Sequence, residues 1–420
     1  TQPNEQQKAV VVAYKSLKND YLKMVGNAPA VAKKKMEEAF ALENRIAKVS
    51  YDQVKSRDPQ ANYHPMTWEQ LLKDYPGIDW NYILKIAGYP NNGGKVDVGQ
   101  PEPVHEVEKI LATAPLDQLK AYMELAVISS SAGMLSDAFS KRKFEYTKVA
   151  YGVQQQQPRW KRALSFVQGI MGEAVGKLYV QKYFPESSKE RMIQLVKNLQ
   201  SAFAQRIEEN TWMTAATKAK ALEKLQAFDI KIGYPDKWQN MDSVFVIDDA
   251  KSLLDNVKNV QEAASKYIIS KRWGKPVDKK LWHMTPQTVN AYYDPSTNSI
   301  NFPAAILQPP FFDPEVDDAA NYGAIGAVIG HEMSHGFDDQ GCQFDKEGNM
   351  KNWWTDEDKK NYDARTKVLV DWFNQQEVIP GLKVNGEKTL GENIGDNGGL
   401  NVAYRALENS MKQNPLTDKD

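Results

Sequence analysis

Two histidines four residues apart, His331 and His335, with Glu332 directly after the first, constrain this chain more than any other feature. On a helix, residues at this spacing project from one face, so both imidazoles can reach one metal ion. A carboxylate at the second position stands beside that ion, where it can take a proton from water and make a nucleophile at neutral pH. The pattern predicts a catalytic zinc site on a helix. Taken alone, it also fits a surface helix that happens to carry two histidines.

A catalytic zinc site needs a third protein ligand and one open position. The best candidate is Glu392, which forms a second pair four residues apart with Asp396 on one predicted helix face. Glu392 would bind the metal, and Asp396 would accept a hydrogen bond from the non-ligating nitrogen of a histidine and so fix its tautomer. Asp338, three residues after His335, is a weaker candidate for such a contact. Asp396, followed by Asn-Gly-Gly, could instead mark the end of a helix.

The composition is that of a soluble globular protein, with 420 residues of which 41% are hydrophobic and 25% charged. The 53 lysines and arginines balance 54 aspartates and glutamates, so no overall field attracts nucleic acid or an anionic membrane. No run approaches the roughly 18 apolar residues of a membrane span. A single cysteine, Cys342, excludes an internal disulfide framework and is more typical of an apolar filler than of a metal ligand. We therefore expect neither a nucleic-acid partner nor a membrane span.

The chain up to about residue 229 has the apolar periodicity of successive helices with short connections. Thr67 and Gln70 are expected to form a capping box at one helix start, and Ser187 is expected to begin another. A further helix is expected over residues 249–272. This pattern predicts an all-α region with no catalytic residues of its own.

Two short β-prone runs follow, over residues 288–293 and 299–302, around a Pro-containing turn. They predict a hairpin. The expected organisation is therefore a mostly helical domain over residues 1–275, with an approximate boundary, and a zinc catalytic domain over residues 276–420.

Five blocks in the last third, which agree in order and spacing, make the chain resemble the neprilysin family of zinc endopeptidases. The blocks are Val289–Tyr293, Phe302–Phe312, Val328–Asp339, Asn352–Trp354 and Gly391–Leu400. The low cysteine count makes the chain most similar to the bacterial members. The resemblance implies a mainly α fold, with a large helical covering domain and a thermolysin-like zincin catalytic domain that contains a small β-hairpin or sheet.

The resemblance also implies the chemistry of the site. It implies one zinc ion per chain, with His331, His335 and Glu392 as ligands. It implies Glu332 as the general base that then gives the proton to the leaving amine. Asp396 would orient His331.

Substrate contacts are implied by the same resemblance. Asn290 and the backbone of Ala291 would hold a peptide as an added strand, since backbone pairing makes little demand on side chains. Ile306, Phe311 and Val328 match positions of the family's pocket for a bulky apolar residue just after the cut bond, although such residues commonly belong to the core. The family encloses its site between two helical lobes, so the expected substrates are peptides and small proteins.

The resemblance is incomplete at both ends of the chain. The family has a segment before its covering domain, and its catalytic domain continues with a histidine that steadies the tetrahedral oxyanion and an arginine that holds the substrate carboxylate. No histidine follows His335 here. We therefore expect a catalytic domain that a second chain or a missing C-terminal segment would complete. Losing one oxyanion donor typically costs on the order of 100 to 1000-fold in turnover, so poor hydrolysis by this chain alone is expected.

Three functions fit these residues. The first is a zinc endopeptidase that cuts on the amino side of bulky hydrophobic residues. The second is a protein that binds zinc and peptides without turnover. The third is an aminopeptidase with the same ligand pattern, which cleavage of N-terminally blocked peptides would exclude. The resemblance to bacterial members favours a secreted, periplasmic or cell-surface location and leaves a cytoplasmic one open.

Overall fold

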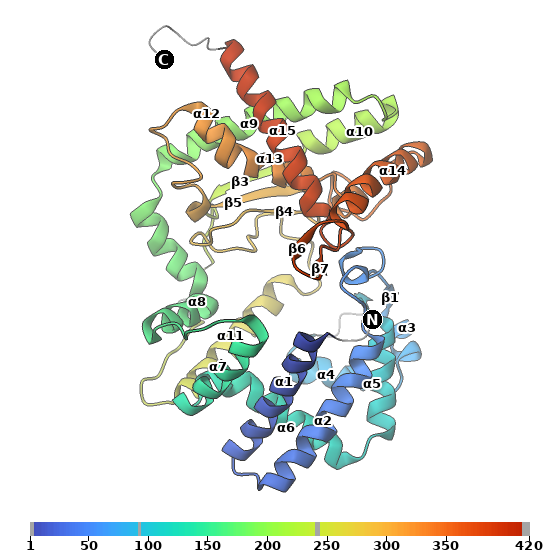
Figure 1. Ribbon diagram of the computed structural model, residues 1–420, viewed down its shortest axis with the longest axis vertical. Helices are drawn as coiled ribbons and strands as arrows, with labels where there is room; N and C mark the ends of the chain where they lie inside the picture. The colour runs from blue at the N-terminus through green and yellow to red at the C-terminus, as the bar shows by residue number, and fades with distance from the viewer. Residues whose placement is uncertain (1–3, 91–93, 240–243, 414–420) are drawn as a thin grey trace. The chain divides into compact units, whose positions relative to one another are not determined.

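The computed structural model describes residues 4–90, 94–239 and 244–413, whose path is drawn in Figure 1. The chain forms two compact units that alternate along the sequence. Unit 1 comprises Thr1–Asp52, Gln60–Ile170 and Asn240–Lys275, and unit 2 comprises Gln53–Pro59, Met171–Gln239 and Pro276–Asp420. The domain division at residue 275 stays a proposal. Unit 2 differs from the proposed catalytic domain because it also takes in two earlier segments.

Unit 1 consists mainly of helices. A small antiparallel sheet of β1 (Pro65–Thr67) and β2 (Lys95–Asp97) lies among them. The helices are α1 (Glu5–Met24), α2 (Pro29–Val49), α3 (Trp68–Asp74), α4 (Trp80–Ala87), α5 (Pro101–Thr113), α6 (Leu116–Ser131), α7 (Asp137–Tyr151) and α11 (Leu253–Arg272). Helix α8 (Arg159–Tyr183) starts in this unit and is kinked at Met171, where the unit boundary falls.

The helix starts test the capping predictions. The capping box at Thr67 is confirmed. The Thr67 hydroxyl accepts a hydrogen bond from the backbone N–H of Gln70, and the side-chain oxygen of Gln70 accepts one from the backbone N–H of Thr67. The start at Ser187 is wrong, because helix α9 (Glu186–Glu209) begins earlier with Pro185 as its N-cap. Pro185 has an extended backbone with a ψ of 152° and makes no side-chain cap, so position 187 already lies in the first turn.

Unit 2 holds the remaining elements. They are the end of α8, α9, α10 (Ala215–Gln226), α12 (Asp318–Asn321), α13 (Ala327–His335), α14 (Asp356–Phe373) and α15 (Leu390–Gln413), with β3 (Asp229–Gly233), β4 (Tyr292–Asp294), β5 (Ser299–Pro303), β6 (Glu377–Ile379) and β7 (Leu382–Lys383). A π-helical segment, Tyr322–Gly326, joins α12 to α13. The fold is thus mainly α with small sheets, as predicted.

The main sheet of unit 2 has the order β3-β5-β4, so β4 is an edge strand. β4 pairs antiparallel with β5, which confirms the predicted hairpin. The predicted start of the first strand at residue 288 is wrong, because the Thr288 amide donates to the Thr285 carbonyl in a turn and the strand begins only at Tyr292. β3 was not predicted, since its parallel pairing with β5 is a contact between distant parts of the chain.

The core of unit 2 joins α9, α10, β3, β5, α13 and α15. Leu199, Leu225, Ile300, Ile329 and Ala403 are each at most 1% exposed within it. Every residue of β5 is buried. The central strand and α13 are therefore fixed by packing on several sides, which gives the residues at the surface of α13 a rigid support.

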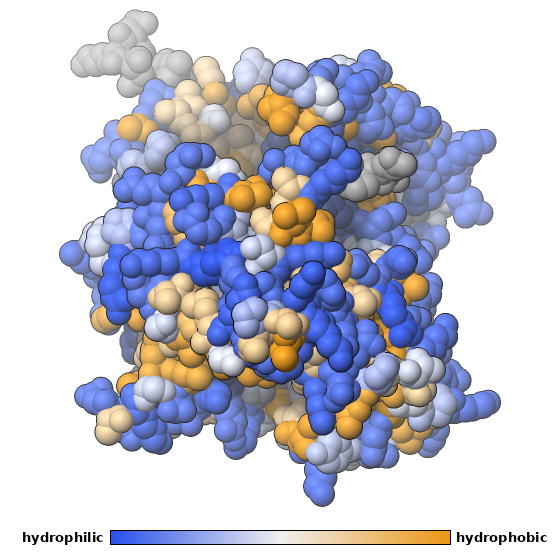
Figure 2. All heavy atoms as spheres, turned by 60° about the horizontal axis from the view of Figure 1, so that its bottom comes forward, coloured by the Kyte–Doolittle hydropathy of each residue, from blue (hydrophilic) through white to orange (hydrophobic). Residues whose placement is uncertain are grey.

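None of the helices in the described ranges has both the length and the apolar character needed to cross a lipid bilayer. On the face of the molecule in Figure 2, hydrophilic residues predominate and apolar residues form separate patches.

Candidate metal centre

Helix α13 presents His331 and His335 on one face and buries the opposite one. Ile329 and Met333, on the buried face, have no exposed surface. The π-helical segment leads directly into α13, so the helical path is continuous from α12 onward. The two histidine side chains are 18% and 17% exposed. The imidazoles are therefore held on a packed helix and still reach solvent.

Glycines bring α15 against α13 (Figure 1). A Cβ atom on Gly330 of α13 would stand 2.7 Å from the carbonyl oxygen of Gly399 of α15, so the backbones touch there. Only residues without a Cβ atom allow such an approach. The glycines of α15 on this side are Gly391, Gly395, Gly398 and Gly399. The spacing of these glycines in the sequence could have indicated close helix packing. The periodicity of apolar residues does not indicate it.

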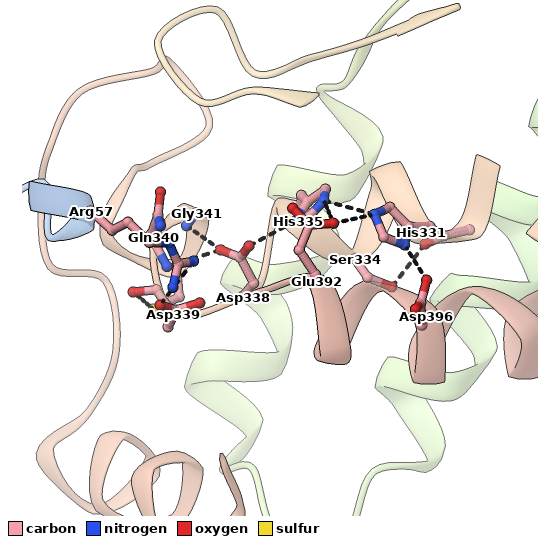
Figure 3. Close-up of polar contacts among 12 residues, drawn as sticks. Arg57, His331, Ser334, His335, Asp338, Asp339, Gln340, Gly341, Glu392 and Asp396 are labelled. Atoms are coloured by element: carbon pink, nitrogen blue, oxygen red, sulfur yellow. Dashed lines mark hydrogen bonds and ion pairs between the residues drawn. The ribbon is translucent and has the colours of Figure 1, made fainter. Parts of the chain in front are cut away.

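The ligand atoms of His331, His335 and Glu392 converge (Figure 3). Nε2 of His331 lies 2.9 Å from Nε2 of His335 and 3.3 Å from Oε2 of Glu392. Nε2 of His335 lies 3.9 Å from the same carboxylate oxygen. Within the described residues, this is the group of histidine, cysteine, aspartate and glutamate side chains that could hold a metal ion.

The spacing and chemistry of these donors fit zinc. Tetrahedral zinc with bonds of about 2.0–2.1 Å keeps its donor atoms about 3.3 Å apart, and the three separations span that value. Two imidazoles with one carboxylate suit zinc, whereas calcium and magnesium prefer oxygen ligands. The hydrogen bond that the His331 imidazole donates to the carboxylate of Glu392 is the main reason that the pKa of His331 is raised to about 9. Metal ligands must be deprotonated, so a divalent cation bound here would replace the proton on Nε2 of His331.

Each histidine has a carboxylate at its other ring nitrogen. Nδ1 of His331 is 2.9 Å from Oδ1 of Asp396, and Nδ1 of His335 is 2.8 Å from Oδ2 of Asp338. Asp396 lies inside α15, so the alternative that it ends a helix is wrong. These contacts would fix both tautomers with Nε2 directed toward the metal position.

The two carboxylates differ in how firmly they are held. Asp338 is buried, and its Oδ1 also accepts from the backbone amides of Gln340 and Gly341, at 2.9 and 2.6 Å. The Asp396 side chain is 81% exposed. From the sequence, Asp338 was the weaker candidate of the two. Residue spacing does not predict the turn that buries it.

Glu332 lies on α13 between the two histidines in sequence and is 5% exposed. Burial raises the pKa of its carboxyl to about 7, against the charges of His335 and His331, which lower it. The backbone of Tyr293, in β4, also acts to lower this pKa. Helix α13, which carries Glu332 and both histidines, also packs against the edge strand β4.

The residues expected to contact substrate fall into two groups. Asn290 and Ala291 directly precede β4, with Asn290 exposed and Ala291 buried. Ile306 is buried in the hydrophobic core, and Phe311 and Val328 are partly buried against it. Their expected contacts with substrate stay predictions, and core packing accounts for the burial of the three apolar residues.

Two basic residues near the site were missed by the sequence reasoning. The Arg57 guanidinium reaches the turn after α13 and the loop before α15. The Lys224 ammonium donates to the carbonyls of Gly341 and Phe344 in the same turn. No local pattern marks either residue, since each acts through contacts more than 100 positions away.

Two family models, both described as peptidase family M13, match residues 1–235 and 290–420. The neutral endopeptidase of Lactobacillus helveticus is 36% identical over 388 residues, which are 92% of this chain and 60% of that protein. The chain thus spans less than two thirds of this relative.

Solved structures are similar over nearly the whole chain. The zinc metalloprotease Zmp1 of Mycobacterium tuberculosis, in complex with an inhibitor, superimposes with a TM-score of 0.92 at 41% identity, covering 99% of this chain and 64% of that one. PepO of Lactobacillus rhamnosis HN001 gives a TM-score of 0.90 at 28% identity, covering 99% of this chain and 65% of that one.

Proposed function

The chain belongs to peptidase family M13, and on that premise we propose that it is a zinc-dependent endopeptidase acting on peptides and small proteins. The observation that carries this proposal is the cluster of His331, His335 and Glu392, whose ligand atoms lie within 4.8 Å of one another. The buried carboxylate of Glu332 on the same helix supplies the acid–base group that hydrolysis needs.

One zinc ion would be held by Nε2 of each histidine and by the carboxylate of Glu392. When bound, zinc supplies a Lewis acid that polarises a carbonyl and lowers the pKa of water. Asp396 and Asp338 hold the imidazoles at Nδ1, which keeps each Nε2 available.

Glu332 is proposed as the general base. Its carboxylate takes the proton of the attacking water, holds it at a carboxyl oxygen, and gives it to the amine nitrogen that leaves when the peptide bond breaks. The helix fixes the position of this carboxylate, and its burial restrains it further. Burial keeps bulk water from competing for the proton.

The substrate is proposed to lie along β4. This strand is an edge of the three-stranded sheet, so one side of its backbone has no strand partner within that sheet. Asn290 and the backbone of Ala291 would pair with the peptide and direct it toward Glu332, which the same strand contacts. Ile306, Phe311 and Val328 would receive a bulky apolar side chain on the carboxyl side of the cut bond.

Zinc content and cleavage of doubly blocked peptides test the proposal. We expect about one zinc per chain and chelator-sensitive cleavage before a phenylalanine or leucine in N-acetylated, C-amidated peptides. Glu332→Gln should keep the zinc and lose about 100 to 10,000-fold in turnover, the range for a general acid–base group. Full activity of Glu332→Gln would contradict the mechanism, and cleavage restricted to free N-termini would indicate an aminopeptidase.

A second candidate is a chain that binds zinc and peptides but turns them over only with a second chain or a further segment. The chain spans 60% of the Lactobacillus helveticus enzyme and 64% of the Zmp1 structure, so the activity of those whole proteins is a proposal for this chain. Zinc binding with saturable peptide binding and no cleavage would support it. Cleavage that appears only when the rest of a relative's sequence is added as a separate chain would identify what is required.

The location is part of the proposal. We place the protein outside the cytoplasm, as a secreted, periplasmic or cell-surface protein that meets extracellular peptides. Its free cysteine, Cys342, is buried, so an oxidising compartment would not form a disulfide through it without unfolding. Cell fractionation with an antibody to the chain is the measurement, and recovery in the cytoplasm alone would contradict it.

A further inference from the structure

Arg57 joins the two segments that carry the metal-binding residues (Figure 3). It ends the 3-10 turn Lys55–Arg57, in the short segment Gln53–Pro59 that belongs to unit 2. Its side chain is 26% exposed, so most of it lies within the fold. The metal-binding residues are about 270 to 340 positions away in sequence, and the contact is therefore a product of the tertiary structure.

On one side, the guanidinium holds the loop that leads into α15. Nη1 donates to the carbonyl oxygens of Glu387 and Lys388, at 3.0 and 2.6 Å. Helix α15 begins at Leu390 and carries Glu392 in its first turn. These two bonds fix the entrance of the helix only a few residues before the proposed ligand.

On the other side, the same guanidinium holds the turn after α13. The side-chain amide oxygen of Gln340 faces the guanidinium. Nε and Nη2 of Arg57 donate to this oxygen at 2.9 and 2.7 Å. Nη2 also lies 3.6 Å from Oδ2 of Asp339. A planar guanidinium can bind both segments at once because its donors point in fixed, diverging directions.

From this turn, hydrogen bonds continue to a histidine. The backbone amide of Gln340 donates to Oδ1 of Asp338, and Oδ2 of Asp338 lies 2.8 Å from Nδ1 of His335. The path from Arg57 to the imidazole thus has two intermediate residues. Each is placed by a hydrogen bond of 2.9 Å or less.

Charge and packing favour the same arrangement. Burial, then the charge of Asp338, raise the pKa of Asp339 to about 6, and the charge of Arg57 opposes both. A Cβ atom on Gly391 would stand 2.7 Å from Oδ2 of Asp338 and 3.1 Å from Nη2 of Arg57. The absence of a side chain at Gly391 therefore leaves room for the guanidinium beside the carboxylates.

We propose that Arg57 is a positioning residue of the metal centre, which clamps the turn after α13 to the entrance of α15 and so sets the distance between the two histidines and Glu392. The proposal rests on the metal site proposed above. Arg57 touches neither the metal position nor the reacting atoms. Its effect is on how well the three ligands are arranged before the ion binds.

The test measures zinc affinity of the metal-free protein by competition with a coloured chelator, without reference to activity. In Arg57→Met we expect the zinc Kd to rise about 10 to 100-fold, the usual effect of removing a group that orients metal ligands. Arg57→Lys keeps the positive charge but loses the several diverging N–H donors of the guanidinium. It should therefore recover only part of the zinc affinity. The rise in Tm caused by a fixed zinc concentration should shrink in the same order, because that rise reports affinity for the folded state.

Arg405→Met is the matched control. Arg405 makes a two-bonded ion pair with Glu209, at 3.0 and 3.1 Å, from the same helix α15 but further along it. It should change the zinc Kd less than about threefold, because its contacts are made well after the helical turn that bears Glu392.

Several outcomes would overturn the inference. Wild-type zinc affinity in folded Arg57→Met would do so, and so would an equal loss in Arg405→Met. If Arg57→Met fails to fold, Arg57→Lys decides, and wild-type affinity in that variant would exclude the clamp. A wild-type chain that binds no zinc would instead contradict the proposed function, and with it the clamp.

Discussion

Gly395 of α15 lies so close to His331 of α13 that a Cβ atom added to it would stand 2.7 Å from Nδ1 of the imidazole. Side-chain carbons do not come this near to other atoms without one of them moving. Moving the helix away would open the packed contact between Gly399 and the backbone of α13 one turn further along. The position of His331, the first of the proposed ligands, therefore depends on the absence of a side chain on the facing helix.

Gly395→Ala should weaken zinc binding. The added methyl must turn the imidazole or push α15 away, and we expect the zinc Kd to rise at least about tenfold, as for other changes around metal ligands. Gly323→Ala is the control, since a Cβ atom at Gly323 would meet nothing within 4 Å. Alanine is about 1 kcal/mol better than glycine inside a helix, so propensity alone predicts no loss for either variant. Chelator competition is the measurement, and equal affinities would contradict the packing argument.

The proposed ligand set could be predicted from sequence because it depends on helical spacing. His331 and His335, and then Glu392 and Asp396, each stand four residues apart, and a helix converts that interval into a shared face. Arg57 could not be predicted in this way. It reaches Lys388 across 331 positions, and no local pattern in either segment indicates the contact.

The fold shows the same limit. The helical class followed from apolar periodicity, and the hairpin of β4 and β5 followed from β-prone runs around a turn. The parallel strand β3 was missed because its partner lies about 70 residues later in the chain. The late start of β4 depends on a turn at Thr285 and Thr288, whose residues alone are compatible with a strand.

Asp338→Asn should reduce zinc affinity more than Asp396→Asn. Asp338 is buried and accepts hydrogen bonds from two backbone amides as well as its contact with His335. Asparagine at position 338 would place a neutral amide group where these donors need a carboxylate. At position 396 the carboxylate is exposed, so water can take over its contact. We expect the zinc Kd to rise about 10 to 100-fold for Asp338→Asn and less for Asp396→Asn. The reverse order, measured by chelator competition, would mean that burial does not determine the importance of the two carboxylates.

Asp358→Asn should lower stability at neutral pH by about 2 kcal/mol. This buried carboxylate accepts hydrogen bonds from the backbone amide of Thr214 and the hydroxyl of Thr355, and a hydrogen bond to a charged group is worth about 1.5–3 kcal/mol. Chemical unfolding at pH 7 is the measurement. Asp363→Asn, which removes only an exposed ion pair with Lys359, is the control and should change stability by less than about 0.5 kcal/mol.

The same carboxylate should contribute to acid unfolding. Burial raises the pKa of Asp358, but hydrogen bonds from the hydroxyls of Thr214, Thr217 and Thr355 outweigh it and lower the pKa to about 2. The unfolded value is about 3.9, so the folded protein binds fewer protons between these values. The stabilisation is therefore complete above about pH 5 and is lost as the pH falls toward 2. Asp358→Asn should lose less stability than wild type over that range, and a parallel decline would exclude this contribution.

Lys224→Met should destabilise unit 2 and flatten its response to alkaline pH. The ammonium is 1% exposed and donates to the carbonyls of Gly341 and Phe344, so its loss leaves buried acceptors unpaired at a cost of about 1–3 kcal/mol. Lys220→Met, which removes an exposed pair on the same helix, should cost less than about 0.5 kcal/mol.

The sign of the pH effect follows from the pKa of this lysine. Burial lowers the pKa of Lys224 to about 7, against the attraction of charges that include Asp338. The unfolded chain keeps the proton up to about pH 10.4, so between these values it binds more protons than the folded protein. Stability from this group therefore rises as the pH goes from 7 toward 10. Unfolding free energies at pH 7, 8 and 9 should show a smaller rise in Lys224→Met than in Lys220→Met, and equal slopes would mean that Lys224 keeps its charge in the folded protein.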